Sequence, residues 1–147
     1  MEINRIIELS AELINKDFSI EVMPKTAEKV YDFSEILPSK TLVYIAHLED
    51  TDISDMVHAC KRLIDEDMIP MPHIPARILS SYSELEEWVS QYAEVGVKRC
   101  LLLAGNNKIP KGSLNNSIQL LETGFFEKYR YEYINVAGHP EGNPDID

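Results

Sequence analysis

The sequence predicts an α/β fold in one domain, with about five parallel strands joined by crossover helices. Apolar runs of strand length alternate with segments of helical periodicity at roughly thirty residues per unit, which is the spacing of right-handed βαβ crossovers. The chain of 147 residues is long enough to bury one ordinary core. A polar or otherwise distinctive residue marks the exit of every predicted strand, namely Glu21, His47, His73, Asn106 and His139.

These strand exits favour one of two α/β architectures. A doubly wound open sheet gathers its ligand groups at a switch point, whereas a barrel recruits the ends of most strands into one pocket. The nucleotide-binding patterns GxGxxG and GxxxxGK[ST] are absent. We therefore predict the first five strands of a TIM (β/α)8 barrel, preceded by an amphipathic N-terminal helix marked by Ile3, Ile6, Ile7, Leu13 and Ile14.

The first half of the chain gives two strands and two helices after that opening helix. Residues 18–23 predict a strand that Pro24 ends, and residues 41–46 predict the second strand. Between them, a helix capped by Thr26 is indicated by Val30, Phe33, Ile36 and Leu37. Asp52 is the predicted cap of the next helix, whose apolar face carries Ile53, Met56, Val57, Cys60, Leu63 and Ile64.

The second half begins with a strand over residues 68–71. Three prolines, Pro70, Pro72 and Pro75, surround His73 and predict that the strand runs into a rigid loop. Ser83 and Glu86 match a capping box, and Gly96 ends the helix that follows. Residues 98–104 and 131–137 are the last two strands, and the helix between them is marked by Leu114, Ile118, Leu121 and Phe125.

Composition excludes several classes of partner. The net charge of −11 and the pI near 4.7 argue against nucleic acid and anionic membranes, which need clustered Lys and Arg. The N-terminus lacks the apolar run of a signal peptide, so we expect a cytoplasmic protein. Cys60 and Cys100 fall in apolar segments without a CxxC pair, which predicts core residues rather than a disulfide or a zinc site.

Four segments resemble the methylenetetrahydrofolate reductase family of flavin-dependent TIM-barrel enzymes. Residues 19–26 (SIEVMPKT) are similar to the family's first strand, and residues 71–73 (MPH) to its third. Residues 102–106 (LLAGN) resemble the Arg-Gly-Asp turn after strand four, and residues 136–141 (VAGHPE) the Ala-Tyr-Pro-Glu turn after strand five. The resemblance implies reduction of 5,10-methylenetetrahydrofolate to 5-methyltetrahydrofolate, with FAD as cofactor and NAD(P)H as a candidate electron donor.

The same resemblance assigns roles to residues. Glu21 takes the place of the family's catalytic acid, while the flavin contacts would be His47, His73, Ala104, Gly105, Asn106, Asn116, His139 and Asn143. The chain departs from the family where Ala104 and Asn106 replace Arg and Asp, His139 replaces Tyr, Asn143 replaces His and Ala46 replaces Thr. These changes remove a cation and a carboxylate from the flavin-contacting residues.

Glu21 would protonate a folate nitrogen, so that the methylene bridge opens to an iminium that accepts hydride. Ile20, Val22 and Met23 suggest apolar surroundings that favour the protonated acid. The alternative for Glu21 is a solvated carboxylate at a strand end. Because family barrels have eight strands, we also expect this chain to need the remaining barrel strands, or another subunit, to make a competent enzyme.

Other readings stay open for the remaining residues. The histidines could be structural, or with Glu21 could bind a metal in a barrel hydrolase, although no HxH or HExxH spacing supports a metal. Gly105 could serve only a turn, and Asn116, with Asn115 and Ser117, could cap a helix. A folate-binding subunit without flavin is the alternative to a reductase.

Overall fold

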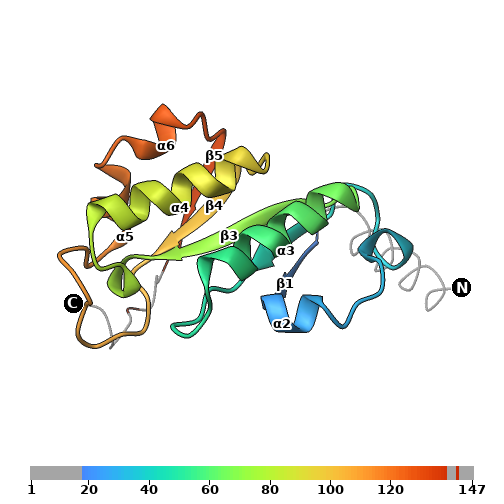
Figure 1. The fold of residues 1–147 in the computed structure, drawn as a ribbon, viewed down its shortest axis with the longest axis horizontal. Helices are drawn as coiled ribbons and strands as arrows, with labels where there is room; N and C mark the ends of the chain where they lie inside the picture. The colour runs from blue at the N-terminus through green and yellow to red at the C-terminus, as the bar shows by residue number, and fades with distance from the viewer. Residues whose placement is uncertain (1–17, 139–141, 143–147) are drawn as a thin grey trace, which may run out of the picture.

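The computed structural model describes residues 18–138 and residue 142 (Figure 1). The expected N-terminal helix, His139 and Asn143 therefore lie outside the described residues. Five parallel strands form one sheet in the order β1-β2-β3-β4-β5. The strands are β1 (Ser19–Val22), β2 (Leu42–Ile45), β3 (Ile69–Pro75), β4 (Arg99–Leu103) and β5 (Tyr133–Val136). The predicted α/β class and all five predicted strands are confirmed.

The helices cover one face of this sheet (Figure 1). They are α2 (Pro24–Ala27), α3 (Ile53–Asp65), α4 (Tyr82–Glu94), α5 (Ser117–Leu121) and α6 (Phe125–Lys128), with 3-10 turns η1 (Phe33–Glu35) and η2 (Ala76–Ile78). Alternate strand residues point toward them, because successive side chains of a strand face opposite sides. The resulting core includes Val43, Ile45, Ile74, Cys100 and Leu102 from the strands and Met56, Leu63, Leu85, Val89, Tyr92 and Phe126 from the helices.

The opposite face carries no helix in the described part of the chain, and it is concave. Tyr44 on β2 and Asn135 on β5 would stand more than about 14 Å apart on a flat sheet. Their side chains nevertheless meet, with Asn135 Nδ2 3.3 Å from the Tyr44 hydroxyl. Such contacts across two intervening strands require the sheet to curl. We call this side the concave face and define it by Glu21, Tyr44, Met71, His73, Leu101 and Asn135.

The proline-rich segment is part of the central strand, so the prediction that β3 ends before His73 is wrong. Ile69 donates its N–H to Thr41 on the β2 side, and the direction alternates along a parallel strand. A backbone N–H at the position of Pro70 or Pro72 would therefore point toward β4. The β3–β4 ladder begins only at His73, whereas the β2–β3 ladder ends at Pro72. The prolines stand where no ladder donor is needed, which permits them in a central strand.

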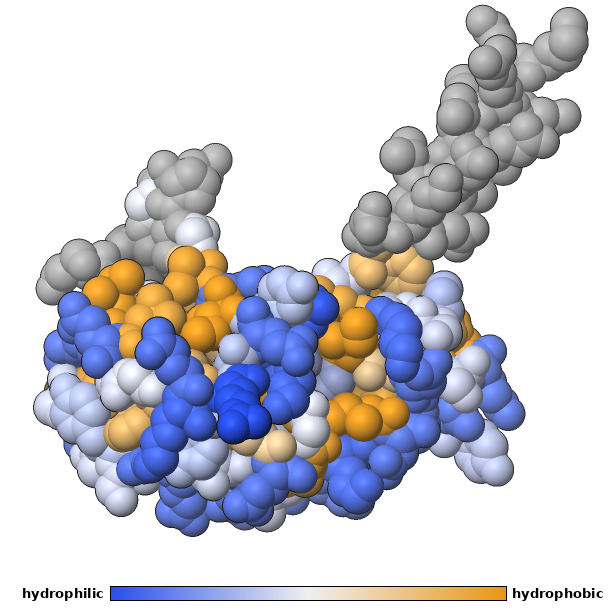
Figure 2. All heavy atoms as spheres, turned by 90° about the horizontal axis from the view of Figure 1, so that it is seen from above, coloured by the Kyte–Doolittle hydropathy of each residue, from blue (hydrophilic) through white to orange (hydrophobic). Residues whose placement is uncertain are grey.

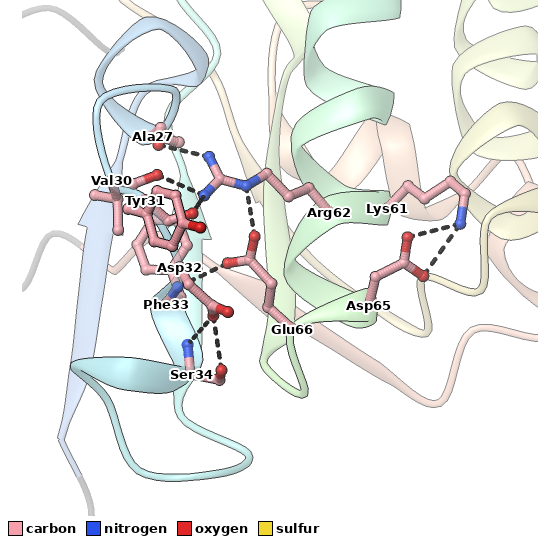
Figure 3. Close-up of polar contacts among 10 residues, drawn as sticks. All are labelled: Ala27, Val30, Tyr31, Asp32, Phe33, Ser34, Lys61, Arg62, Asp65 and Glu66. Atoms are coloured by element: carbon pink, nitrogen blue, oxygen red, sulfur yellow. Dashed lines mark hydrogen bonds and ion pairs between the residues drawn. The ribbon is translucent and has the colours of Figure 1, made fainter.

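The segment between β1 and β2 is not the predicted helix. Only one turn forms at α2, where the Thr26 hydroxyl bonds with the backbone of Met23. The rest is held by Arg62 of α3, whose guanidinium donates to the carbonyls of Ala27, Val30 and Tyr31 (Figure 3). Glu66 pairs with Arg62 at 2.6 Å and accepts the N–H of Phe33 at 2.8 Å. The apolar residues that suggested a helix are therefore anchored by a distant element.

The later helices differ from the prediction in their ends. Ser81 caps α4 by accepting from the N–H of Glu84, two residues before the predicted capping box at Ser83. Glu86, the other half of that box, instead pairs with Lys128. The helix predicted to follow β4 is interrupted between α5 and α6, where Gly124 has a φ of 71°. Gly96, with a φ of 96°, ends α4 as expected.

The described residues also bear on the crossing of a membrane and on the state of the two cysteines. Among them, no helix combines the length and the apolar character that crossing a membrane requires. Cys60 and Cys100 are both buried and unbridged in the core. Burial raises the pKa of the Cys100 thiol to about 12, so it stays protonated at neutral pH. The cysteines are core residues, as the sequence predicts.

Candidate functional site

The predicted site residues divide between the two faces of the sheet. Glu21 and His73 lie on the concave face, with their side chains pointing away from the helices. His47 lies at the end of β2 on the helix side, where its ring stacks on Trp88 of α4 with a centroid distance of 4.5 Å. Glu21 and His47 therefore do not share one pocket, and the candidate site is built on the concave face.

Glu21 and His73 meet across β2. Their nearest atoms, Glu21 Oε2 and His73 Nε2, are 3.5 Å apart, which is too long for a directed hydrogen bond. The His73 side chain is 13% exposed, and that of Glu21 is 61% exposed. Burial lowers the pKa of His73, and the Glu21 carboxylate opposes this shift. The site thus combines an accessible carboxyl group with a mostly buried imidazole whose pKa is lowered.

Tyr44 and Asn135 complete the polar part of this face, and the sequence prediction missed both. Glu21 and Tyr44 are paired in the β1–β2 register. The Asn135 amide donates to the Tyr44 hydroxyl at 3.3 Å and to Met71 Sδ at 3.5 Å. An open depression of about 570 Å³ lies over these residues, lined by Glu21, Tyr44, Leu101, Ile134, Asn135 and Val136. Polar residues at concave positions of otherwise apolar strands were the available signal.

The apolar surroundings expected for Glu21 are not those that the structure gives it. Ile20 and Val22 point to the other face and pack against the core beneath the helices. The neighbours of Glu21 on its own face are instead Tyr44, by register, and His73. A carboxylate in this setting has polar partners and access to solvent, and it can reach a ligand bound in the depression.

His47 has a structural explanation. It is 7% exposed, and its Nε2 lies 3.1 Å from the carbonyl oxygen of Thr51, to which it donates. Burial lowers the pKa of His47, so the ring stays neutral against Trp88. A second open depression of about 560 Å³ lies beside it, bounded by Leu48, Pro75, Leu103, Asn106 and Ile109 among others. Asn106 is exposed there, and Lys111 pairs with Glu49 close by, at 3.3 Å.

The turn after β4 and the start of α5 also serve the fold. Ala104 is 6% exposed, and its carbonyl accepts the N–H of Arg77 at 2.9 Å. Gly105 has a φ of 90°, and a Cβ there would lie 3.1 Å from Pro75 Cβ. Asn116 caps α5 by accepting the N–H of Gln119 at 3.0 Å. The turn and cap interpretations of Gly105 and Asn116 therefore have direct structural support.

These observations bear on the implied FAD. Of the described residues expected to contact it, His47 is buried against Trp88, Ala104 is nearly inaccessible and the Asn116 oxygen is already used. The contact of Gly105 with Pro75 leaves no space on that side of its backbone. Of the remaining residues, His73 lies on the concave face, whereas Asn106 lines the second depression beside His47. The described residues do not fit a flavin site.

A metal site receives no support from the described residues either, since they contain no group of three His, Cys, Asp or Glu side chains arranged to hold an ion. His58 is exposed on α3, away from the concave face. Comparison of the chain with models of known protein families gives no match.

Proposed function

We propose that the chain belongs to folate one-carbon metabolism as the opening part of a TIM barrel of the methylenetetrahydrofolate reductase type, with Glu21 as its proton donor. The observation that carries the proposal is the position of Glu21. It stands on the concave face, 3.5 Å from His73 and beside a depression of about 570 Å³. A reduced pterin ring has polar edges that suit the polar residues of this depression, and Leu101 provides an apolar wall.

The sheet supports the barrel part of the proposal. Its strands follow one another in chain order, whereas a doubly wound sheet reverses order at a switch point. The sheet also curls, so that β2 and β5 make side-chain contact across the concave face. Side chains that meet in this way fill the interior of a barrel. Three further strands, or a second copy of the chain, would cover the open edges at β1 and β5.

Glu21 can perform one defined step in this reaction. Opening the methylene bridge of the folate requires a proton on N10, after which the bridge carbon is an iminium on N5. The hydride that reduces this iminium would come from a reduced flavin or nicotinamide held by the part of the barrel outside the described residues. Glu21 is accessible and lies in the depression, so its carboxyl group can approach that nitrogen. His73 cannot replace it as a donor at neutral pH, because burial lowers its pKa. Glu21 is therefore the proposed donor, and a bound folate would cover its carboxyl group and favour the protonated form.

The isosteric variant Glu21→Gln tests this assignment. It keeps the volume of the side chain but cannot donate a carboxylic proton, so reduction of methylenetetrahydrofolate should fall by roughly a hundredfold or more. Ser19→Ala, on the same face of β1 and exposed, is the control and should keep full activity. The assay uses the chain together with whatever subunit completes the barrel. Unchanged turnover in Glu21→Gln would return Glu21 to a solvated strand residue.

A second candidate is a folate-binding chain that carries no flavin. The poor fit of Ala104, Gly105 and Asn116 to a flavin favours it, because these residues already serve the backbone of the fold. The visible spectrum of the purified protein separates the two functions. Absorbance near 450 nm, roughly the flavin maximum, at one equivalent per chain would support the reductase. A colourless protein that binds 5-methyltetrahydrofolate would support the binding function.

A further inference from the structure

Asn135 and Tyr44 form a hydrogen-bonded pair in which each side chain can make a further hydrogen bond. The Asn135 amide uses its nitrogen, donating to the Tyr44 hydroxyl and to Met71 Sδ. Its oxygen receives no hydrogen bond from any residue within 18–138. The Tyr44 hydroxyl accepts from Asn135 and keeps its own proton, for which the described residues provide no acceptor. The pair therefore presents one acceptor and one donor, side by side.

The packing around the pair fixes its position on the concave face. The Tyr44 ring makes an edge contact with the His73 ring, with centroids 6.0 Å apart. Asn135 is held at two points on other strands, through Tyr44 on β2 and Met71 on β3. Side chains fixed before a ligand arrives lose little conformational entropy on binding, which is how a site becomes selective.

We propose that Asn135 and Tyr44 recognise a lactam edge, an N–H group next to a ring carbonyl, on the heterocycle that binds in the depression. The Asn135 oxygen accepts from the N–H, and the Tyr44 hydroxyl donates to the carbonyl. Asn135 Nδ2 lies 3.3 Å from the Tyr44 hydroxyl, so the free amide oxygen and the free hydroxyl proton belong to adjacent side chains. Leu101 provides apolar surface for the ring itself.

The identity of the heterocycle rests on the proposed function, and the order of the residues agrees with a pterin. In that ring the N3–H and the C4 carbonyl form the lactam edge, and N5, which carries the one-carbon bridge, lies next to C4. The residues that would contact these groups follow the same order across the sheet: Asn135, then Tyr44, then Glu21. With C4 at Tyr44, the five-membered ring that holds the bridge between N5 and N10 lies on the side of Glu21, the register partner of Tyr44 on β1, so the proton can go to N10 and leave the iminium on N5. Asn135 thus determines specificity and positions the folate for Glu21.

Two ligands that differ only at this edge give a direct test. Folic acid has the lactam edge, whereas its 4-amino analogue, aminopterin, has an amino group in place of the carbonyl and no N3 proton. We expect the full chain to bind folic acid at least tenfold more tightly than aminopterin, measured by isothermal titration calorimetry. The mismatch leaves polar groups unpaired in the aminopterin complex, which is the usual source of such discrimination.

The variants Asn135→Leu and Tyr44→Phe should each reduce this preference by about three- to tenfold, the value of one neutral hydrogen bond. Tyr133→Phe is the matched control, because it removes a hydroxyl from the same face of β5 that has no partner among the described residues. It should retain the preference. Circular dichroism of each variant establishes that the fold persists.

The outcomes separate this inference from the proposed function. Equal affinity for folic acid and aminopterin, or an unchanged preference in Asn135→Leu, overturns the lactam site while folate binding stands. Binding of uridine, which has a lactam edge, without any binding of folic acid would support the site if Asn135→Leu abolishes it, and would refute the folate function. Binding of neither folic acid nor uridine refutes both.

Discussion

The two faces of the sheet are made by alternate residues of the same strands, yet they serve different purposes. Toward the helices, Val43, Ile45 and Leu102 are fully buried and apolar. Toward the concave side, Glu21 and Asn135 are polar and accessible. Apolar residues also reach the surface in patches between hydrophilic ones (Figure 2). Exposed apolar side chains near the strand ends include Leu48 and Ile109. The parity of a residue in its strand thus decides whether its side chain packs against the helices or faces the concave side.

The two histidines repeat this comparison with identical chemistry. Both have a pKa lowered by burial, so both are neutral at physiological pH. His47 stacks its ring on Trp88 and donates from Nε2 to Thr51, while its buried Nδ1 has no hydrogen-bond partner among the described residues. His73 has an unpaired Nε2 that faces a carboxylate across the concave face. Whether a histidine can take part in a site therefore depends on the face of the sheet to which it points, rather than on its place at a strand end.

The largest expected effect comes from neighbouring leucines of β4. Leu102→Ala removes a fully buried side chain from the core and should lower the free energy of unfolding by about 2–5 kcal/mol. Leu101→Ala, one residue earlier and on the concave face, should cost at most about 1 kcal/mol. Urea denaturation measures both. Equal losses would mean that the concave face is covered in solution as completely as the helix face.

A second contrast lies between two ion pairs of α3. Arg62→Met removes the contacts with three backbone carbonyls and Glu66, which are half-buried, and should cost about 1–3 kcal/mol. Lys61→Met breaks the exposed pair with Asp65, drawn beside it in Figure 3, and should change the unfolding free energy by no more than about 0.5 kcal/mol. Similar values for the two variants would show that the β1–β2 segment does not depend on Arg62.

Gly105 tests whether the turn after β4 belongs to the fold or to a ligand. Gly105→Ala places a Cβ 3.1 Å from Pro75 Cβ at a φ of 90°, and should cost about 1–2 kcal/mol in stability. Gly138→Ala is the control, because a Cβ there meets nothing within 4 Å. Folate affinity should be unchanged in Gly105→Ala. Loss of binding without loss of stability would instead assign this glycine to a ligand site.

How far the sequence could predict these features depends on whether local signals decide them. The strands were found because their apolar runs are local, and Gly96 ends α4 as its pattern indicates. The helix predicted around Val30 fails because a distant residue, Arg62, holds that segment. The cap of α4 was misplaced because Ser81 with Glu84 and Ser83 with Glu86 have the same spacing, and only the contact of Glu86 with Lys128 distinguishes them.

The candidate site was predictable only in part, for the same reason. Glu21 was identified from its resemblance to a family motif, and it lies on the concave face. Asn135 was missed because its significance arises from the curl of the sheet, which brings it to Tyr44 from a strand that is 91 residues away in sequence. His47 and His73 were grouped because both follow apolar runs, although the extension of β3 through its prolines gives them opposite orientations.

The smallest expected effect is a change in the titration of one histidine. Glu21 is the charge that raises the pKa of His73 against the effect of burial, so Glu21→Gln should lower the pKa of His73 further. The His47 pKa should change much less, because Glu21 does not act on it directly and His73 is only one of the charges that do, with Glu84 and Lys111. Proton NMR of the assigned imidazole resonances between pH 4 and pH 8, roughly the range of histidine titration, measures both values.

The sign of the accompanying stability change follows from proton linkage. A histidine whose pKa is lower in the folded than in the unfolded chain binds fewer protons when folded, so stability is complete above roughly pH 6.5 and falls as the pH drops below it. Glu21→Gln should increase the difference between the His73 pKa in the folded and in the unfolded chain. The loss of stability at acidic pH should therefore be larger in this variant. A His73 pKa that does not respond to Glu21→Gln would mean that the two side chains do not meet across β2 in solution. The concave face would then be flatter than the contacts of Tyr44 with Asn135 require, and the lactam site would lose its geometry as well.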